Sequence, residues 1–193
     1  MKPVNLYIDL DDTLLHTHQW MVELMYRANG YRHAGKGFMT PENTNGNIVP
    51  LLDSAEFMRG TPVNQPLVDV LKQLPDHVQI NVCTHRGYHK KGVQYTEELL
   101  DSLKIDFIRS FEYLCAFKQP NKVDYLRSLG EEYILLDDNP KFNDSTTLER
   151  TGEVMVYTQE WNRYLPIPEH LRVNCPTELL TKLEQNPIYQ KYS

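Results

Sequence analysis

Two carboxylates, Asp9 and Asp11, follow the apolar residues 4–8 and are separated by a single residue. A short apolar stretch that ends abruptly in charge is typical of a buried strand, and open α/β sheets bind ligands at the carboxyl ends of such strands. A carboxylate there can attack phosphorus to form an aspartyl phosphate, and a second one can transfer the leaving-group proton. Asp9 suits the first role and Asp11 the second. A solvated acidic turn is the alternative interpretation.

A second apolar stretch, residues 78–83, leads into a polar turn that offers groups for binding phosphate. Its hydroxyl can donate to an oxyanion, its guanidinium can bind phosphate with two donors, and its glycine permits a tight turn of the backbone. A helix-capping threonine and a solvated arginine are the alternative interpretations. The residues of this turn are Thr84, His85, Arg86 and Gly87.

A third strand end repeats the acidic pattern of the first. Asp137 and Asp138 follow the apolar residues 133–136, and an Asn-Pro turn comes next. Ordinary turn chemistry also accounts for such a sequence, but two acidic strand ends in one chain are harder to assign to chance. Hard oxygen ligands from two strand ends suit Mg²⁺, which keeps several waters and also contacts substrate phosphate. We therefore predict a Mg²⁺ site between these strand ends.

The elements that must position these groups alternate along the chain. Short β-rich stretches are separated by segments whose apolar residues recur at helical spacing. This alternation predicts an α/β fold with a mostly parallel sheet covered on both faces. The expected strands are residues 4–8, 78–83, 107–114, 133–136 and 154–157, and the expected helices are residues 18–30, 66–74, 93–103, 123–129 and 176–183.

About fifty residues separate the first expected strand from the helix at residue 66, too many for a simple loop. We expect a core domain from residues 1–15 and 62–193, with a small helical cap inserted from residues 16–61. The aromatic residues of the cap either fill its own small core or contact a substrate ring. Trp20 and Phe38 are the candidates for contacts with substrate.

Composition limits the class of protein. The chain has 193 residues, 40% of them hydrophobic, and 20 basic against 26 acidic residues give a net charge of −6. This balance argues against binding to extended nucleic acid or to an anionic membrane surface. The 3 cysteines lack the spacing of a zinc site or a disulfide framework. Because no apolar stretch approaches the roughly 20 residues that span a bilayer, we expect a cytoplasmic protein without a membrane partner. The oligomeric state is not predicted.

Taken together, the motifs resemble those of the haloacid dehalogenase (HAD) superfamily. Residues 9–13, Asp-Leu-Asp-Asp-Thr, resemble its motif I, Thr84 matches motif II, and Asp137 with Asp138 matches the Asp-Asp form of motif IV. The resemblance implies a three-layer Rossmann-like fold with strand order 5-4-1-2-3. In that order the three strand ends become neighbours at one edge of the sheet.

The resemblance also implies a metal site and its ligands. Mg²⁺ would be held by Asp9, by the backbone carbonyl of Asp11 and by a carboxylate of motif IV. Members of the superfamily differ over which motif IV residue binds the metal directly. By resemblance to its nucleotidase branch, Asp138 is favoured over Asp137.

The superfamily further supplies a lysine shortly before the motif IV strand. Its charge offsets the charges of the nucleophile and the phosphate. Two candidates exist, since Lys122 opens the helix before that strand and Lys118 lies just upstream. Lys122 is favoured, and a solvated surface lysine is the alternative interpretation of either residue.

Within the superfamily, Asp11 points to a phosphatase or a phosphomutase, because dehalogenases lack an acid at this position. Residues 53–85 and 95–103 resemble the cytosolic-type 5′(3′)-deoxyribonucleotidases. That branch implies a nucleoside monophosphate as substrate and partner. The chain departs from it at Asp12, where glycine is common, and at His85, where a small hydroxyl residue is frequent.

Three other functions are compatible with parts of the sequence. Residues 9–16 also resemble the start of the carboxyl-terminal-domain protein phosphatases, which bind an extended phosphopeptide in an uncapped cleft, whereas the inserted segment favours a small substrate. A polynucleotide end phosphatase is disfavoured because the chain has no basic track. A catalytically silent module that binds phosphate or a nucleotide is disfavoured because both Asp9 and Asp11 are present.

Overall fold

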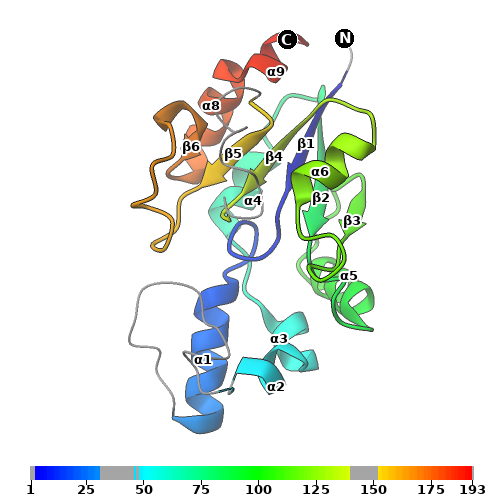
Figure 1. The fold of residues 1–193 in the computed structure, drawn as a ribbon, viewed down its shortest axis with the longest axis vertical. Helices are drawn as coiled ribbons and strands as arrows, with labels where there is room; N and C mark the ends of the chain where they lie inside the picture. The colour runs from blue at the N-terminus through cyan, green and yellow to red at the C-terminus, as the bar shows by residue number, and fades with distance from the viewer. Residues whose placement is uncertain (1–2, 31–45, 47, 140–151, 193) are drawn as a thin grey trace.

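The computed structural model describes residues 3–30, 46, 48–139 and 152–192. At its centre lies a sheet in the order β3-β2-β1-β4-β5-β6, and every neighbouring pair of strands is parallel (Figure 1). The strands are β1 (Val4–Ile8), β2 (Val78–Thr84), β3 (Phe111–Tyr113), β4 (Tyr133–Asp137), β5 (Val154–Tyr157) and β6 (Arg172–Val173).

The predicted parallel sheet and its order 5-4-1-2-3 are confirmed, with β6 added beyond β5. This last strand is only 2 residues long, too short to produce a pattern in the sequence. In the central register Ile8 pairs with Val82 on β2 and with Leu136 on β4. The residues that follow these three positions therefore end at one level of the sheet. This register brings the polar strand ends together.

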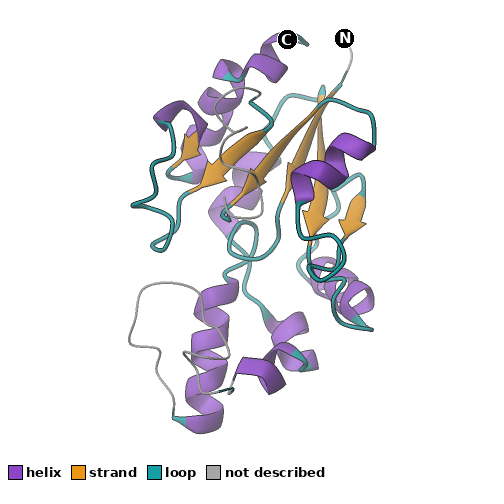
Figure 2. Cartoon of the chain, viewed as in Figure 1, coloured by secondary structure: helices purple, strands orange, loops and turns teal. Residues whose placement is uncertain are grey.

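Helices cover both faces of the sheet (Figure 2). They include α4 (Gln65–Leu71), α5 (Gly92–Ser102), α6 (Lys122–Ser128), α8 (Leu179–Gln185) and α9 (Pro187–Gln190). Leu6 and Ile8 of β1 belong to an apolar cluster shared with α4, α5, α8 and α9. Tyr7, between them, belongs to a second cluster with α6. Because side chains alternate along a strand, this division shows that β1 is buried on both sides.

The helix boundaries follow local chemistry. The side chain of Asn64 accepts a hydrogen bond from Leu67 N at the start of α4, and a proline occupies the first turn. At the start of α6, the side chain of Asn121 accepts a hydrogen bond from Asp124 N. The expected helix at residues 176–183 instead begins as a 3₁₀ turn, η3 (Pro176–Glu178), and continues as α8.

The segment inserted after β1 contains α1 (Thr17–Asn29), α2 (Ile48–Leu52) and α3 (Ala55–Gly60), which lie beyond the carboxyl ends of the strands (Figure 1). These helices share an apolar cluster that includes Met25 and Phe57 and reaches Tyr95 of α5. The chain enters and leaves the segment side by side, since His16 N donates to Pro62 O at 2.8 Å. Because this hydrogen bond joins the two ends of the segment, we propose that residues 16–61 form a cap.

Among the residues that the structure describes, every helix is too short or too polar to cross a bilayer.

Candidate active site

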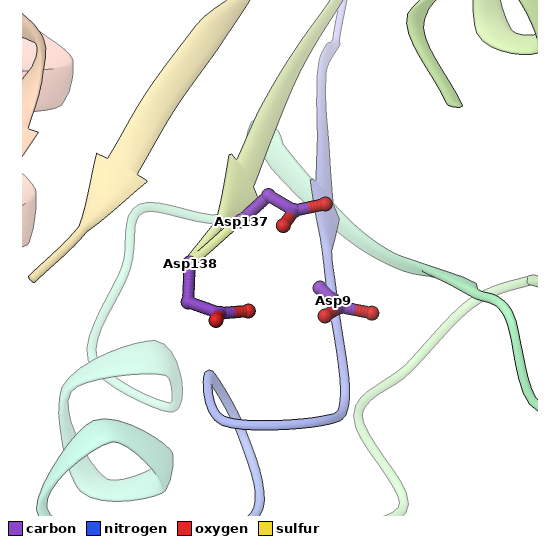
Figure 3. Close-up of side chains that lie close together, drawn as sticks. All are labelled: Asp9, Asp137 and Asp138. Atoms are coloured by element: carbon purple, nitrogen blue, oxygen red, sulfur yellow. The ribbon is translucent and has the colours of Figure 1, made fainter. Parts of the chain in front are cut away.

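Three buried carboxylates meet at the carboxyl edge of the sheet. Asp9 follows β1, Asp137 ends β4 and Asp138 follows it, and the three side chains lie close together (Figure 3). One carboxylate oxygen from each lies within 4.8 Å of the others. The structure thus brings together three of the carboxylates that the sequence assigned to a Mg²⁺ site.

Lys122, the first residue of α6, lies among these carboxylates. Its Nζ is 2.7 Å from Asp9 Oδ1 and 2.8 Å from Asp137 Oδ2, and its side chain is 2% exposed. The side chain of Asn121 caps the N-terminus of α6, so that the helix begins at Lys122, whose ammonium group reaches the site. Lys118, the other candidate, is an exposed residue in the preceding loop.

The charges at this edge do not balance in the protein alone. Burial raises the pKa of Asp9 to about 8; Lys122 opposes the shift, and Asp137 and Asp11 add to it. Burial, followed by the charges of Asp137 and Asp9, holds the pKa of Asp138 well above its usual value. Several buried carboxylates against one lysine form an oxygen donor set that fits a divalent cation.

We expect Mg²⁺ binding to release protons at pH 7, because the ion binds the ionised carboxylates while Asp9, whose pKa burial raises to about 8, is largely protonated without it. The apparent Mg²⁺ affinity should therefore rise with pH as Asp9 loses its proton. Titration calorimetry in two buffers of different ionisation enthalpy measures the released protons directly. An affinity that does not change with pH, without proton release, would contradict this assignment.

Stability without metal should show the opposite trend. A carboxyl group whose pKa is higher in the folded than in the unfolded protein stabilises the fold while it is protonated. That contribution is lost as the pH rises from about 4 toward the raised value of about 8 for Asp9. The stabilisation of the fold by Mg²⁺ should therefore be larger at pH 8 than at pH 6.

Asp11 lies at the edge of this group and is held by other partners. Arg86 Nη2 and Nε donate to Asp11 Oδ1 at 2.7 and 3.0 Å, and Thr17 Oγ1 donates to the same oxygen at 2.7 Å. Burial acts to raise the pKa of Asp11, but the Arg86 charge and these hydrogen bonds hold it below its usual value. Asp11 is therefore a carboxylate of fixed orientation.

Arg86 takes a different place from the phosphate contact expected from the sequence. Its guanidinium is 1% exposed, and besides Asp11 it donates to Met58 O at 3.0 Å and to Thr61 Oγ1 at 3.3 Å. Each of its three nitrogens thus donates to the protein. No local sequence pattern indicates this role, because Asp11 is 75 residues away.

Thr84 and His85 precede Arg86 in the same turn. Thr84 is fully buried at the end of β2, and its Oγ1 accepts a hydrogen bond from Arg86 N at 3.3 Å. His85 lines the cavity above the carboxylates, and its Nε2 is 3.0 Å from Gln119 O. Burial, with a smaller effect of Lys122, lowers the pKa of His85.

A cavity of about 430 Å³ opens over the site. Asp9, Lys122 and Asp138 are among the charged residues that line it. The inserted helices and the turn after β2 supply apolar and aromatic side chains to its walls, from Met21, Leu52, Phe57 and Tyr88. The cavity therefore combines charged groups with apolar walls.

The two expected substrate contacts are not found on these walls. Trp20 lines a neighbouring cavity of about 800 Å³, and its ring packs against Gly60. The position of this ring on α1 accounts for the difference, because Met21 and Thr17 are the α1 residues on the wall of the reactive cavity. Phe38 lies outside the described residues.

Asp12 explains one departure from the nucleotidase pattern. It adopts a φ of 58°, a conformation that glycine reaches without cost and that aspartate tolerates better than most residues. Its carboxylate accepts a hydrogen bond from His18 N at 2.6 Å, and its carbonyl accepts one from Gln159 Nε2 at 2.5 Å. Burial raises its pKa to about 7. Asp12 thus stabilises the turn and does not belong to the group of three carboxylates, Asp9, Asp137 and Asp138.

No protein-family model and no curated protein sequence matches this chain. Solved structures match it over nearly their whole length at low identity. A haloacid dehalogenase-like family hydrolase from Xanthomonas campestris has a TM-score of 0.59 and 13% identity, with 98% of this chain and 99% of that chain covered.

Two further structures show the same likeness. A predicted phosphatase from Clostridium acetobutylicum gives a TM-score of 0.56 at 13% identity, covering 96% of this chain and 100% of that one. The magnesium-bound form of YfnB from Bacillus subtilis, described as a HAD hydrolase, gives a TM-score of 0.51 at 12% identity. The match covers 94% of this chain and 98% of that one. The α/β architecture of this chain is thus a known fold. It is the fold of the HAD-superfamily hydrolases.

Proposed function

We propose that this protein is a Mg²⁺-dependent phosphomonoester hydrolase that acts through an aspartyl phosphate on Asp9, with a nucleoside monophosphate as substrate. One observation carries the proposal: Asp9, Asp138 and Lys122 line a cavity that also has apolar and aromatic walls. The likeness in fold to a predicted phosphatase and to a magnesium-bound HAD hydrolase supports it.

The contacts of the two motif IV carboxylates, Asp137 and Asp138, indicate a different role for each. Asp137 Oδ2 accepts from Lys122 Nζ at 2.8 Å and Oδ1 from Asn139 N at 2.7 Å, so both oxygens already have partners. Asp138 lines the cavity instead. Asp138 and Asp9 would therefore hold the metal directly, together with the Asp11 carbonyl, while Asp137 fixes Lys122. When bound, Mg²⁺ polarises the phosphate and offsets its charge.

The remaining steps belong to side chains of the chain itself. Asp9 attacks phosphorus, and the ammonium of Lys122, already 2.7 Å from it, neutralises charge on the phosphate oxygens. Thr84 accepts a hydrogen bond from Arg86 N and still has its own proton to donate to phosphate. His85 adds a polar group on the wall. Lys118 and Arg86 have no phosphate contact in this scheme.

Asp11 acts as the general acid and base of the proposed reaction. In the first half of the reaction, Asp11 takes up a proton from solvent and passes it to the leaving oxygen; in the second half, its carboxylate takes a proton from the water that attacks the aspartyl phosphate. Arg86 and Thr17 fix its orientation for both steps. The lowered pKa of Asp11 favours the second half, in which a carboxylate acts as base.

The shape of the cavity favours a small substrate. Its volume of about 430 Å³ lies within the range of small-molecule sites, and Phe57 offers an aromatic wall for a nucleobase. A phosphopeptide requires a long open groove, whereas helices α1, α2 and α3 lie over the carboxyl edge (Figure 1). A nucleoside monophosphate places its phosphate at the charged groups and its base against the apolar walls.

The test is phosphate release from a panel of deoxynucleoside and ribonucleoside monophosphates, sugar phosphates and a phosphopeptide. We expect release to concentrate on nucleoside monophosphates and to fall about 100-fold or more when a chelator removes the metal. Release from the phosphopeptide alone would replace the nucleotidase proposal with a protein phosphatase. Tight binding of a nucleotide without turnover would replace it with a binding module.

A further inference from the structure

We propose that Trp161 is a positioning residue for the metal site, which holds the carboxylate of Asp138 through its indole N–H. The inference rests on the Mg²⁺ site of the proposed function. Trp161 Nε1 donates to Asp138 Oδ2 at 3.2 Å, across 23 residues of sequence. Asp138 is the motif IV carboxylate that lines the reactive cavity, so a group that fixes its orientation acts on metal binding.

The loop that carries Trp161 is bonded to Asp138 at a second point, its backbone carbonyl. Asn162 Nδ2 donates to the backbone carbonyl of Asp138 and to that of Tyr157, each at 2.7 Å. One side chain thus joins the last residue of β5 to the residue after β4. Because Asn162 is fully buried, this link is shielded from water.

Arg172, a buried arginine of β6, donates hydrogen bonds to the loop that carries Trp161. Arg172 Nη1 donates to Thr158 Oγ1 at 3.2 Å, and its Nη2 donates to Asn162 O at 3.3 Å and to Leu165 O at 3.1 Å. On the other side, Gln159 Nε2 donates to the carbonyl of Asp12 in the turn after β1. The loop is therefore fixed against both strand ends that supply the carboxylates.

The hydrogen bond has a physical consequence for the ion. Asp138 is 2% exposed and lies beside two other carboxylates, so its charged form has few favourable neighbours without metal. A donor that binds one carboxylate oxygen stabilises the charged form and restricts the rotation of the carboxylate. Such outer groups typically change metal affinity 10- to 100-fold when they are removed.

The chain offers a matched pair of substitutions, because it contains 2 tryptophans and both line the same neighbouring cavity. Trp161→Phe keeps an aromatic ring beside His18, whose ring centre is 5.3 Å away, but removes the N–H donor. Trp20→Phe removes an indole N–H that donates to Glu56 O, far in sequence from the carboxylates. Only the first change alters a contact with Asp138.

Titration calorimetry with Mg²⁺ on the metal-free proteins is the first measurement. We expect the Kd of Trp161→Phe to rise about tenfold and that of Trp20→Phe to stay within about twofold of wild type. Thermal unfolding without metal serves as the folding check for both variants. A wild-type Kd in a folded Trp161→Phe would overturn the inference.

A second measurement needs no variant protein to fold. In a spectrum of the ¹⁵N-labelled indole groups of the wild type, added Mg²⁺ should move the Nε1–H signal of Trp161 and leave that of Trp20 in place. A stationary Trp161 signal under saturating Mg²⁺ would overturn the inference. Wild-type protein that binds no Mg²⁺ would overturn the metal site and the inference together. The expected rise in Kd and the expected movement of the Trp161 signal, without phosphate release from any substrate, would contradict the proposed hydrolase alone.

Discussion

Asp9→Asn is expected to lower kcat for phosphate release by at least about 10⁴-fold, because an amide cannot form the acyl phosphate on which the proposed mechanism depends. The substitution keeps the size of the side chain. It also keeps an oxygen that can accept the 2.7 Å hydrogen bond from Lys122. A large loss of turnover in a folded protein would therefore reflect lost chemistry. Residual activity above a few per cent of wild type would remove Asp9 from the role of nucleophile.

The covalent intermediate gives a direct readout. Wild-type protein quenched in acid during turnover of a ³²P-labelled substrate should retain label, and borohydride should reduce the aspartyl phosphate to homoserine at position 9. Asp9→Asn should retain none. Label at another residue would move the nucleophile, and turnover without any retained label would favour direct attack by water.

Asp12→Asn is the matched control for the same chemical change in the same turn. Asp12 is also buried, but its carboxylate accepts a hydrogen bond from His18 N, which an asparagine oxygen can accept equally well. We expect kcat to fall less than about tenfold in this variant, since no reacting atom is touched. Equal losses in Asp9→Asn and Asp12→Asn would indicate that the turn as a whole, and not the nucleophile, had been damaged.

Local pattern was sufficient to predict the central strands. The apolar runs that become β1, β4 and β5 are short and end at charged or polar residues, and the structure places these strands within one residue of the expected bounds. The parallel pairing of β1 with β2 and with β4 followed from the expected helices that separate these strands along the chain, because parallel neighbours need long crossovers. The expected strand at residues 107–114 is shorter, since only Phe111–Tyr113 joins the ladder of β2.

The contacts of the site were less accessible from sequence. Asp9, Lys122 and Asp137 could be assigned because motif spacing marks them and sheet order makes them neighbours. The Arg86–Asp11 pair and the Trp161–Asp138 hydrogen bond join residues 75 and 23 positions apart. Neither contact repeats with a period or belongs to a recognised motif. Such partners depend on how the loops pack at the carboxyl edge, which a single sequence does not encode locally.

The same limit applies to Trp20, whose contact with substrate stays a prediction. A tryptophan near the start of an inserted helix is a reasonable candidate for a substrate wall, but one position along a helix rotates a side chain by about 100°. Met21 therefore reaches the reactive cavity, while Trp20 faces the neighbouring one. A helical pattern predicts which residues share a face. It does not predict which face meets the site.

Lys122→Met should destabilise the metal-free protein at pH 8 by about 3–5 kcal/mol, because it leaves buried carboxylates without their cation. Lys122 is 2% exposed and bridges Asp9 and Asp137, so no solvent replaces its charge. For a chain of this size the loss corresponds to roughly 10 °C in Tm. The loss should shrink at pH 5, where the carboxylates take up protons instead. Added Mg²⁺ should restore part of the stability at pH 8.

Lys118→Met separates this effect from the general loss of a positive charge. Lys118 lies 4 residues earlier and is exposed, so its removal should change the free energy of unfolding by less than about 0.5 kcal/mol and leave kcat close to wild type. Urea unfolding at both pH values, with and without Mg²⁺, measures the difference between the two variants. A larger loss of stability or turnover in Lys118→Met would exchange the roles of the two lysines. Because both lysines come shortly before β4 in the sequence, this pair decides whether burial beside Asp9, and not position before β4, selects the working lysine.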